Sequence, residues 1–196
     1  MAEYDFPKMK KKLAKYLDED RYEHTMGVMY TCACLAMVHG YDLQDAQCAG
    51  LLHDCAKCIP NPKKLKICAR EGIQVTDFEK DHPFLLHAKL GSYIAKEKYG
   101  ITDEKILSAI ASHTTGKEKM TVLEKIVYIA DYIEPMRDKA PDLDRIRKIA
   151  FQDLDECMYE ILKSTMEYLG DDPSKVDLTS LKAYNYYRSL HYAAKR

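Results

Sequence analysis

Residues 45–57 read DAQCAGLLHDCAK and combine the period of an α-helix with a pair of ionisable side chains. Ala46, Gly50 and His53 follow one another at intervals of four and three residues, which places them on one helix face. Asp54 lies beside His53 at the end of this face. Because burying an imidazole or a carboxylate is costly without a partner, the pair indicates either a ligand site or a compensated core contact.

The helical period recurs on both sides of this stretch, and no sustained alternation of apolar and polar residues predicts a strand. Glycine and proline are scarce and fall between the periodic segments. No internal repeat or low-complexity linker divides the 196 residues, so we predict an all-α fold with a single domain over residues 1–196. We expect helices over residues 6–18, 20–38, 43–56, 62–71, 84–98, 103–113, 119–133, 142–169 with a break or kink near residue 150, and 178–194.

The composition narrows the class of partner. Thirty basic and 31 acidic side chains give a formal charge of −1, so bulk charge gives no reason to expect a nucleic-acid or membrane partner. No apolar run is long enough to span a bilayer. Seven cysteines without an export signal indicate reduced thiols, and we expect a cytoplasmic protein.

Side chains able to bind metal recur on the apolar faces of five predicted helices. His24, for example, lies four residues before Val28 on one apolar stripe. Taken singly, each such residue is more often a hydrogen-bonded core histidine or one half of a buried ion pair. A single site shared by all of them is the simpler explanation, because helical bundles build metal sites from facing helices. The six residues are His24, His53, Asp54, His87, His113 and Asp131.

Five motifs occur in order along the chain: RYEHTMGV (21–28), LLHDCAK (51–57), HAKLGSYIA (87–95), SHTTG (112–116) and IADYIEPMR (129–137). Together they resemble the HD-domain phosphohydrolases, and more closely the YqeK group of symmetrical diadenosine tetraphosphate (Ap4A) hydrolases. The resemblance covers about residues 17–140. It implies an HD-domain helical bundle with a buried dinuclear metal site, whose C-terminal helices complete the bundle and the nucleotide pocket.

The same resemblance implies a ligand set for two divalent metal ions. His24, His53, Asp54 and Asp131 would hold one ion, and Asp54 would bridge to a second ion completed by His87 and His113. Iron is expected, with manganese as the alternative, because imidazole suits these metals better than it suits magnesium. Water activated by the two ions would cut Ap4A, or a related dinucleoside polyphosphate, symmetrically into two ADP, or into GDP from the guanosine analogue. The residues expected to act in catalysis are His53, Asp54, Lys57 and Asp131.

Several polar residues near the ligands are expected to hold the substrate. Lys57 lies one helical turn after His53, and Arg21 one turn before His24, so both can face the same cavity. Arginines can clamp phosphate through a planar fork of donors. The expected substrate contacts are Arg21, His24, Lys57, His87, His113, Thr114, Arg137 and Thr179. The sequence departs from the family near the last of these, because Tyr184 stands where the family tends to have an arginine.

Two alternatives stay open at this level. One is another HD nucleotide phosphohydrolase, acting on deoxynucleotides or on (p)ppGpp. Against (p)ppGpp, Cys55, Ala56 and Lys57 follow the His–Asp pair where alarmone hydrolases have an acidic pair. The other is a non-catalytic nucleotide sensor, which would have no need of six metal-capable side chains. A homodimer also stays open.

Three tempting features are left outside the predicted site. His39 precedes Gly40 at a helix end, and His82 precedes Pro83, so neither lies on an apolar stripe. Cys55 and Cys58 form a C-x-x-C pair, but no second pair is near enough for a zinc ribbon. We expect structural or incidental roles for all of them.

Overall fold

The computed structural model describes residues 4–170 and 175–195, and all regular secondary structure within these ranges is helical. The predicted all-α fold is therefore confirmed. The elements are α1 (Phe6–Leu13), α2 (Glu19–His39), α3 (Leu43–Leu52), α4 (Asn61–Glu71), α5 (Asp77–Asp81), the short 3-10 helix η1 (Pro83–Leu85), α6 (Leu86–Tyr99), α7 (Glu104–Ser112), α8 (Val122–Ile133), α9 (Leu143–Ala150), α10 (Leu154–Leu169) and α11 (Leu178–Ala194).

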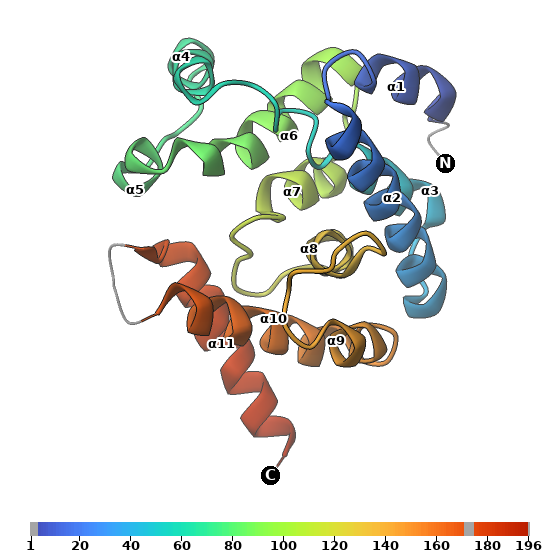
Figure 1. Cartoon of the computed structure of the whole chain (residues 1–196), viewed down its shortest axis with the longest axis vertical. Helices are drawn as coiled ribbons and strands as arrows, with labels where there is room; N and C mark the ends of the chain where they lie inside the picture. The colour runs from blue at the N-terminus through green and yellow to red at the C-terminus, as the bar shows by residue number, and fades with distance from the viewer. Residues whose placement is uncertain (1–3, 171–174, 196) are drawn as a thin grey trace.

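The centre of the molecule is formed by α2, α3, α7 and α8, which pack against one another (Figure 1). Helix α6 packs on α7, and α4 packs on α6 at the periphery. On the other side, α9 and α10 pack on α8, and α11 packs on α10. The apolar faces of the central helices meet in a core that includes Val28, Leu52, Ile110 and Ile126, all fully buried. Within the described ranges, no helix has the length and apolar character needed to cross a bilayer.

Side-chain caps fix the first residues of α2 and α8, the helices that carry His24 and Asp131. Asp18 is the N-cap of α2, and its side chain accepts a hydrogen bond from the backbone N–H of Arg21. Thr121 opens α8 with a capping box, in which the Glu124 carboxylate accepts a hydrogen bond from the Thr121 backbone N–H. Caps of this kind fix where a helix begins, and so which residues its first turns present to the interior.

Several predicted boundaries were wrong for local reasons. The first helix ends at Leu13 instead of residue 18, because the following residues turn through i to i+3 hydrogen bonds. The third ends at Leu52 instead of residue 56, where a similar turn begins. Helix α5 was not predicted, since five residues are too few to show a period. The break near residue 150 was correct and separates α9 from α10.

Helix α11 is held to the centre by a buried tyrosine. The Tyr187 hydroxyl accepts a hydrogen bond of 3.2 Å from the backbone N–H of Met120, just before α8. In a Tyr187→Phe variant that N–H loses its partner, and we expect the free energy of unfolding to fall by about 1–2 kcal/mol. Urea denaturation measures this. Tyr168→Phe, at a side chain that is 89% exposed, should change it by less than about 0.5 kcal/mol. Equal effects at the two positions would contradict the role assigned to the hydroxyl.

Candidate metal centre

The six side chains predicted as metal ligands converge from five helices, although up to 107 positions separate them in the chain. Five of the six are buried, and Asp131 is partly exposed. His53 and His113 occupy the C-cap positions of α3 and α7, where each helix ends against the interior. The remaining positions are His24 on α2, Asp54 immediately after α3, His87 in the first turn of α6 and Asp131 on α8.

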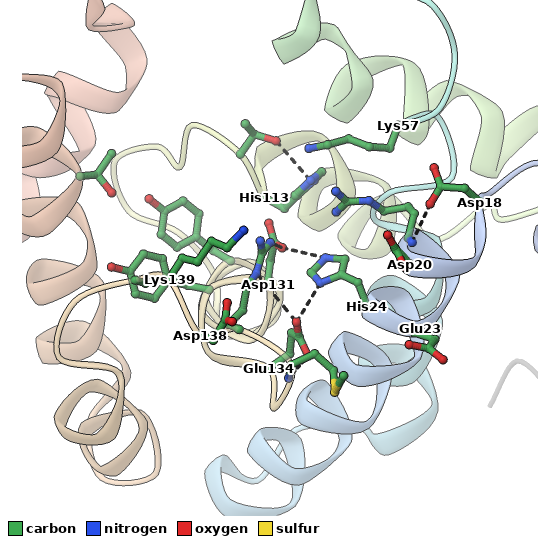
Figure 2. A pocket seen from close by; sticks show the side chains of 18 residues that line it. Asp18, Asp20, Glu23, His24, Lys57, His113, Asp131, Glu134, Asp138 and Lys139 are labelled. Atoms are coloured by element: carbon green, nitrogen blue, oxygen red, sulfur yellow. Dashed lines mark hydrogen bonds and ion pairs between the residues drawn. The ribbon is translucent and has the colours of Figure 1, made fainter.

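One half of the cluster lies between α2 and α8. The His24 Nε2 atom is 3.1 Å from Asp131 Oδ1 and 3.9 Å from Asp54 Oδ2. The His53 Nε2 atom is 3.5 Å from Asp54 Oδ2 and 3.9 Å from Asp131 Oδ1. Two imidazole nitrogens and two carboxylates therefore face a common centre. Figure 2 shows His24 and Asp131 directed toward each other.

The other half lies beside α6 and α7 and shares one residue with the first. The His87 Nε2 atom is 3.2 Å from Asp54 Oδ1, and the His113 Nε2 atom is 3.5 Å from the same oxygen. Asp54 thus directs one oxygen to each half of the cluster. Asp54 is therefore the one residue of the six that the two halves share.

The ring orientation of three histidines is fixed by hydrogen bonds from Nδ1. In each case the acceptor is the backbone carbonyl three residues earlier: Gly50 for His53 at 2.7 Å, Phe84 for His87 at 2.6 Å and Ile110 for His113 at 2.7 Å. A ring that donates from Nδ1–H carries its lone pair on Nε2. All three lone pairs then point into the cluster, as metal binding requires.

Several buried atoms at this centre have no hydrogen-bond partner. Within the described part of the chain, these are His24 Nε2, His53 Nε2 and Asp54 Oδ1. The Nε2 atoms of His87 and His113 also face each other at 3.1 Å, which brings two lone pairs together. Unpartnered buried polar atoms are rare because they lose solvation without compensation. A divalent cation would satisfy these nitrogen and oxygen donors at once, so the residues fit a metal site.

The protonation states also suit metal binding. Burial acts to raise the pKa of Asp54, but the imidazoles of His53, His87 and His113 beside the carboxylate outweigh it and hold that pKa well below its ordinary range. Burial opposes the shift at Asp131 too, where the His24 imidazole beside the carboxylate lowers the pKa overall. At His87, burial lowers the pKa to about 4. Both carboxylates are therefore ionised and His87 is neutral near pH 7, which are the forms that bind metals.

Four of the predicted substrate contacts surround the cluster, namely Arg21, Lys57, Thr114 and Arg137. Arg21 Nη1 donates to Asp54 Oδ2 at 2.8 Å, and Arg137 Nη2 donates to Asp131 Oδ1 at 2.7 Å. Lys57 Nζ is 3.1 Å from His87 Nε2. A cavity of about 840 Å³ opens over the cluster between α2, α8 and the segment after α8. Among the residues that line it are Arg21, His24, Lys57, His113, Thr114, Asp131 and Arg137 (Figure 2).

The structure does not bring Thr179 to this cavity. Its side chain is exposed in the first turn of α11, and its backbone N–H is capped by Asp177. Tyr184 lies further along α11 and stacks on Tyr159, with ring centroids 6.3 Å apart. A contact between Thr179 and the nucleotide therefore stays a prediction from the family resemblance.

The two excluded histidines make contacts of other kinds. His39 Nε2 is 2.7 Å from the backbone carbonyl of Ala150, which ties α2 to α9. His82 stacks on Phe78, with ring centroids 4.2 Å apart, and its Nδ1 atom is 3.0 Å from the Phe78 carbonyl. Each imidazole therefore has a local structural role.

One residue of the site was missed by the sequence analysis. Glu134 is buried, and its Oε1 atom is 3.1 Å from His24 Nδ1. The signal was present, because Glu134 follows Asp131 by three residues and so lies on the same side of α8.

Comparison with known proteins agrees with this geometry. The family model for the HD domain matches residues 21–136. The chain is 40% identical to a Bacillus subtilis protein named "Bis(5'-nucleosyl)-tetraphosphatase, symmetrical", over 87% of this chain and 90% of the relative. It is 38% identical to a Staphylococcus aureus protein of the same name, over 90% of this chain and 92% of the relative.

A solved structure from Clostridium acetobutylicum, described as a "predicted HD superfamily hydrolase involved in NAD metabolism", has the same fold. It superposes with a TM-score of 0.91 at 39% sequence identity, covering 96% of this chain and 100% of that one. This chain belongs to the HD-domain family, in the group that includes the symmetrical bis(5'-nucleosyl)-tetraphosphatases.

Proposed function

We propose that this protein hydrolyses Ap4A, or a closely related dinucleoside polyphosphate, symmetrically into two nucleoside diphosphates. The observation that carries the proposal is the cluster of four histidines and two aspartates, in which Asp54 faces both halves. The Bacillus subtilis and Staphylococcus aureus relatives, which match most of the chain, are named as symmetrical tetraphosphatases, and this name supplies the substrate. Among the residues that line the cavity beside the cluster are Arg21, Lys57 and Arg137, whose positive charges suit a polyphosphate ligand.

We propose two divalent cations at this site, with His24, His53, Asp54 and Asp131 around one, and Asp54, His87 and His113 around the other. Imidazole donors favour iron, or manganese as the alternative, over magnesium. Such ions, when bound, supply Lewis acidity to phosphoryl oxygens and lower the pKa of water.

The protein's own side chains would bind and orient the polyphosphate. Arg21 and Arg137 each offer a guanidinium at the cavity wall, 26% and 40% exposed respectively, so both reach solvent while touching an aspartate of the cluster. Lys57 and Thr114 approach from the α6–α7 side, where both lie 3.1 Å from His87 Nε2. Donors on two sides of the cluster would hold the phosphate chain across it and stabilise charge that develops on its oxygens.

Removing one of these positively charged side chains should weaken binding of the transition state. In Arg137→Ala we expect kcat/KM for Ap4A to fall by about 100-fold, because a charged donor at the reacting phosphates is lost. Steady-state kinetics on the manganese-loaded protein measures this. The matched control is Arg145→Ala, whose guanidinium binds Glu160 away from the cavity and should leave kcat/KM within about twofold. Equal effects in the two variants would argue against a substrate role for Arg137.

Product analysis tests the proposed reaction and its alternatives. Protein loaded with iron or manganese is incubated separately with Ap4A, ppGpp and dGTP, and products are separated by chromatography. ADP as the sole product from Ap4A supports symmetrical cleavage. ATP plus AMP from Ap4A would refute symmetrical cleavage. Faster formation of product from ppGpp or dGTP would favour another HD phosphohydrolase. Tight binding of a nucleotide without any product would favour a sensor.

A further inference from the structure

Glu134 is a buried carboxylate at the C-terminal end of α8, beside the metal cluster. Only 1% of its surface is exposed, and it forms the C-cap of the helix. Its Oε1 atom is 3.1 Å from His24 Nδ1, and its Oε2 atom accepts a hydrogen bond of 2.7 Å from the backbone N–H of Met136. Both oxygens are thus satisfied, which offsets the cost of burying the charge. Figure 2 shows His24 lying between Glu134 and Asp131.

His24 needs such a partner because of its place in the helix. The other three cluster histidines donate to backbone carbonyls at helix ends or beside a 3-10 turn. His24 lies within α2, where backbone carbonyls already accept from residues one turn later. The carbonyl three residues before it, on Arg21, also accepts from the Thr25 hydroxyl. An acceptor for the His24 Nδ1–H must therefore come from another segment.

We propose that Glu134 is a positioning residue that holds His24 with its Nε2 lone pair directed at Asp131 and the metal cluster. A proton fixed on Nδ1 by the carboxylate leaves Nε2 as a donor atom to a cation, and the negative charge behind the ring strengthens that donation. The 3.1 Å separation between His24 Nε2 and Asp131 Oδ1 is then the approach of two ligands toward one ion. This role rests on the proposed metal site.

Gly27 makes room for this contact. It lies in α2 one turn after His24, and a Cβ atom built on it would come within 2.6 Å of Glu134 Oε2. Glycine destabilises a helix interior relative to alanine. Its presence here allows the carboxylate to approach α2 closely enough to reach the His24 ring.

The backbone around Glu134 is also held in place. Arg147 on α9 donates to the carbonyls of Ile133, Glu134 and Arg137, each at 3.0 Å. One guanidinium thereby satisfies the last carbonyls of α8 and fixes the segment that follows. The Glu134 side chain consequently starts from a fixed backbone position.

Manganese affinity tests the proposal without relying on turnover. Isothermal titration calorimetry with Mn²⁺ compares the wild type with Glu134→Gln, which keeps the side-chain size but loses the charge. We expect the affinity to fall by about 10- to 100-fold. The control is Glu124→Gln on the same helix, where an equally buried carboxylate binds Lys117 and Thr121 away from the cluster. That variant should lower the melting temperature while keeping Mn²⁺ affinity within about twofold.

Gly27→Ala separates positioning from stability. The added methyl group must displace the Glu134 carboxylate from His24, so Mn²⁺ affinity should fall, although the better helix propensity of alanine would by itself stabilise α2. Unchanged affinity in Glu134→Gln or in Gly27→Ala would overturn the positioning role while leaving the proposed hydrolase intact. A wild type that binds no Mn²⁺ would overturn the metal site itself, and this role with it.

Discussion

Asp54→Ala should lose turnover of Ap4A by about 10³-fold or more, the largest effect expected of any single substitution in this protein. The reason is its position, because one carboxylate oxygen faces His53 at 3.5 Å and the other faces His87 at 3.2 Å. Removing it would deprive both proposed ions of a ligand at once. Product release measures turnover, and metal analysis of the purified variant should show that bound metal is lost.

Two further variants show whether the loss of turnover comes from the loss of a metal ligand. Asp54→Asn keeps the size of the side chain and should behave like Asp54→Ala, which separates the loss of charge from the loss of packing. His39→Ala removes an imidazole that contacts only the Ala150 carbonyl among its described partners, and it should keep both turnover and metal within about twofold. Loss of metal in His39→Ala, or full activity in Asp54→Asn, would show that the ligands have been assigned wrongly.

Chelation of the metal should abolish hydrolysis and destabilise the protein. Without a cation, the buried lone pairs of His24 and His53 and the Asp54 oxygen have no partner within the described chain, which is an energetic cost to the folded state. A ligand that binds only the folded state raises its stability, so the melting temperature should rise with metal concentration. We expect chelator-treated protein to retain less than about 1% of its activity.

Add-back of individual metals completes this test. Fe²⁺ under anaerobic conditions, or Mn²⁺, should restore activity and the melting temperature together, whereas Mg²⁺ should restore little because imidazole is a poor ligand for it. Full recovery with Mg²⁺, or activity that survives exhaustive chelation, would contradict a site built on four histidines.

The cluster could be predicted from sequence because each of its six side chains breaks the apolar pattern of its helix. A histidine or aspartate on an apolar stripe must be buried, and six such residues need compensation. The structure brings all six together, although separate segments supply them. Helix type and order were predictable for the same reason, since long periodic segments report which face is buried.

The features that were missed depend on contacts or on short elements. Glu134 lies 110 positions from His24, and spacing placed it near Asp131 without showing which ring it would reach. Helix α5 is held by the capping box at Thr76, and no period reveals it. The early end of α3 turns His53 into a C-cap residue, which gives its Nδ1–H a carbonyl to bind. A contact between distant segments, a short capped turn and the exact end of a helix are not encoded in the helical period.

Anomalous diffraction from crystals of the manganese-loaded protein would locate the bound ions. We expect two manganese peaks inside the bundle, with the carboxylate of Asp54 contacting both. A single peak away from these residues, or a structure in which the ligand side chains stand apart with no ion between them, would contradict it. The residues that should surround the two peaks are His24, His53, His87, His113 and Asp131.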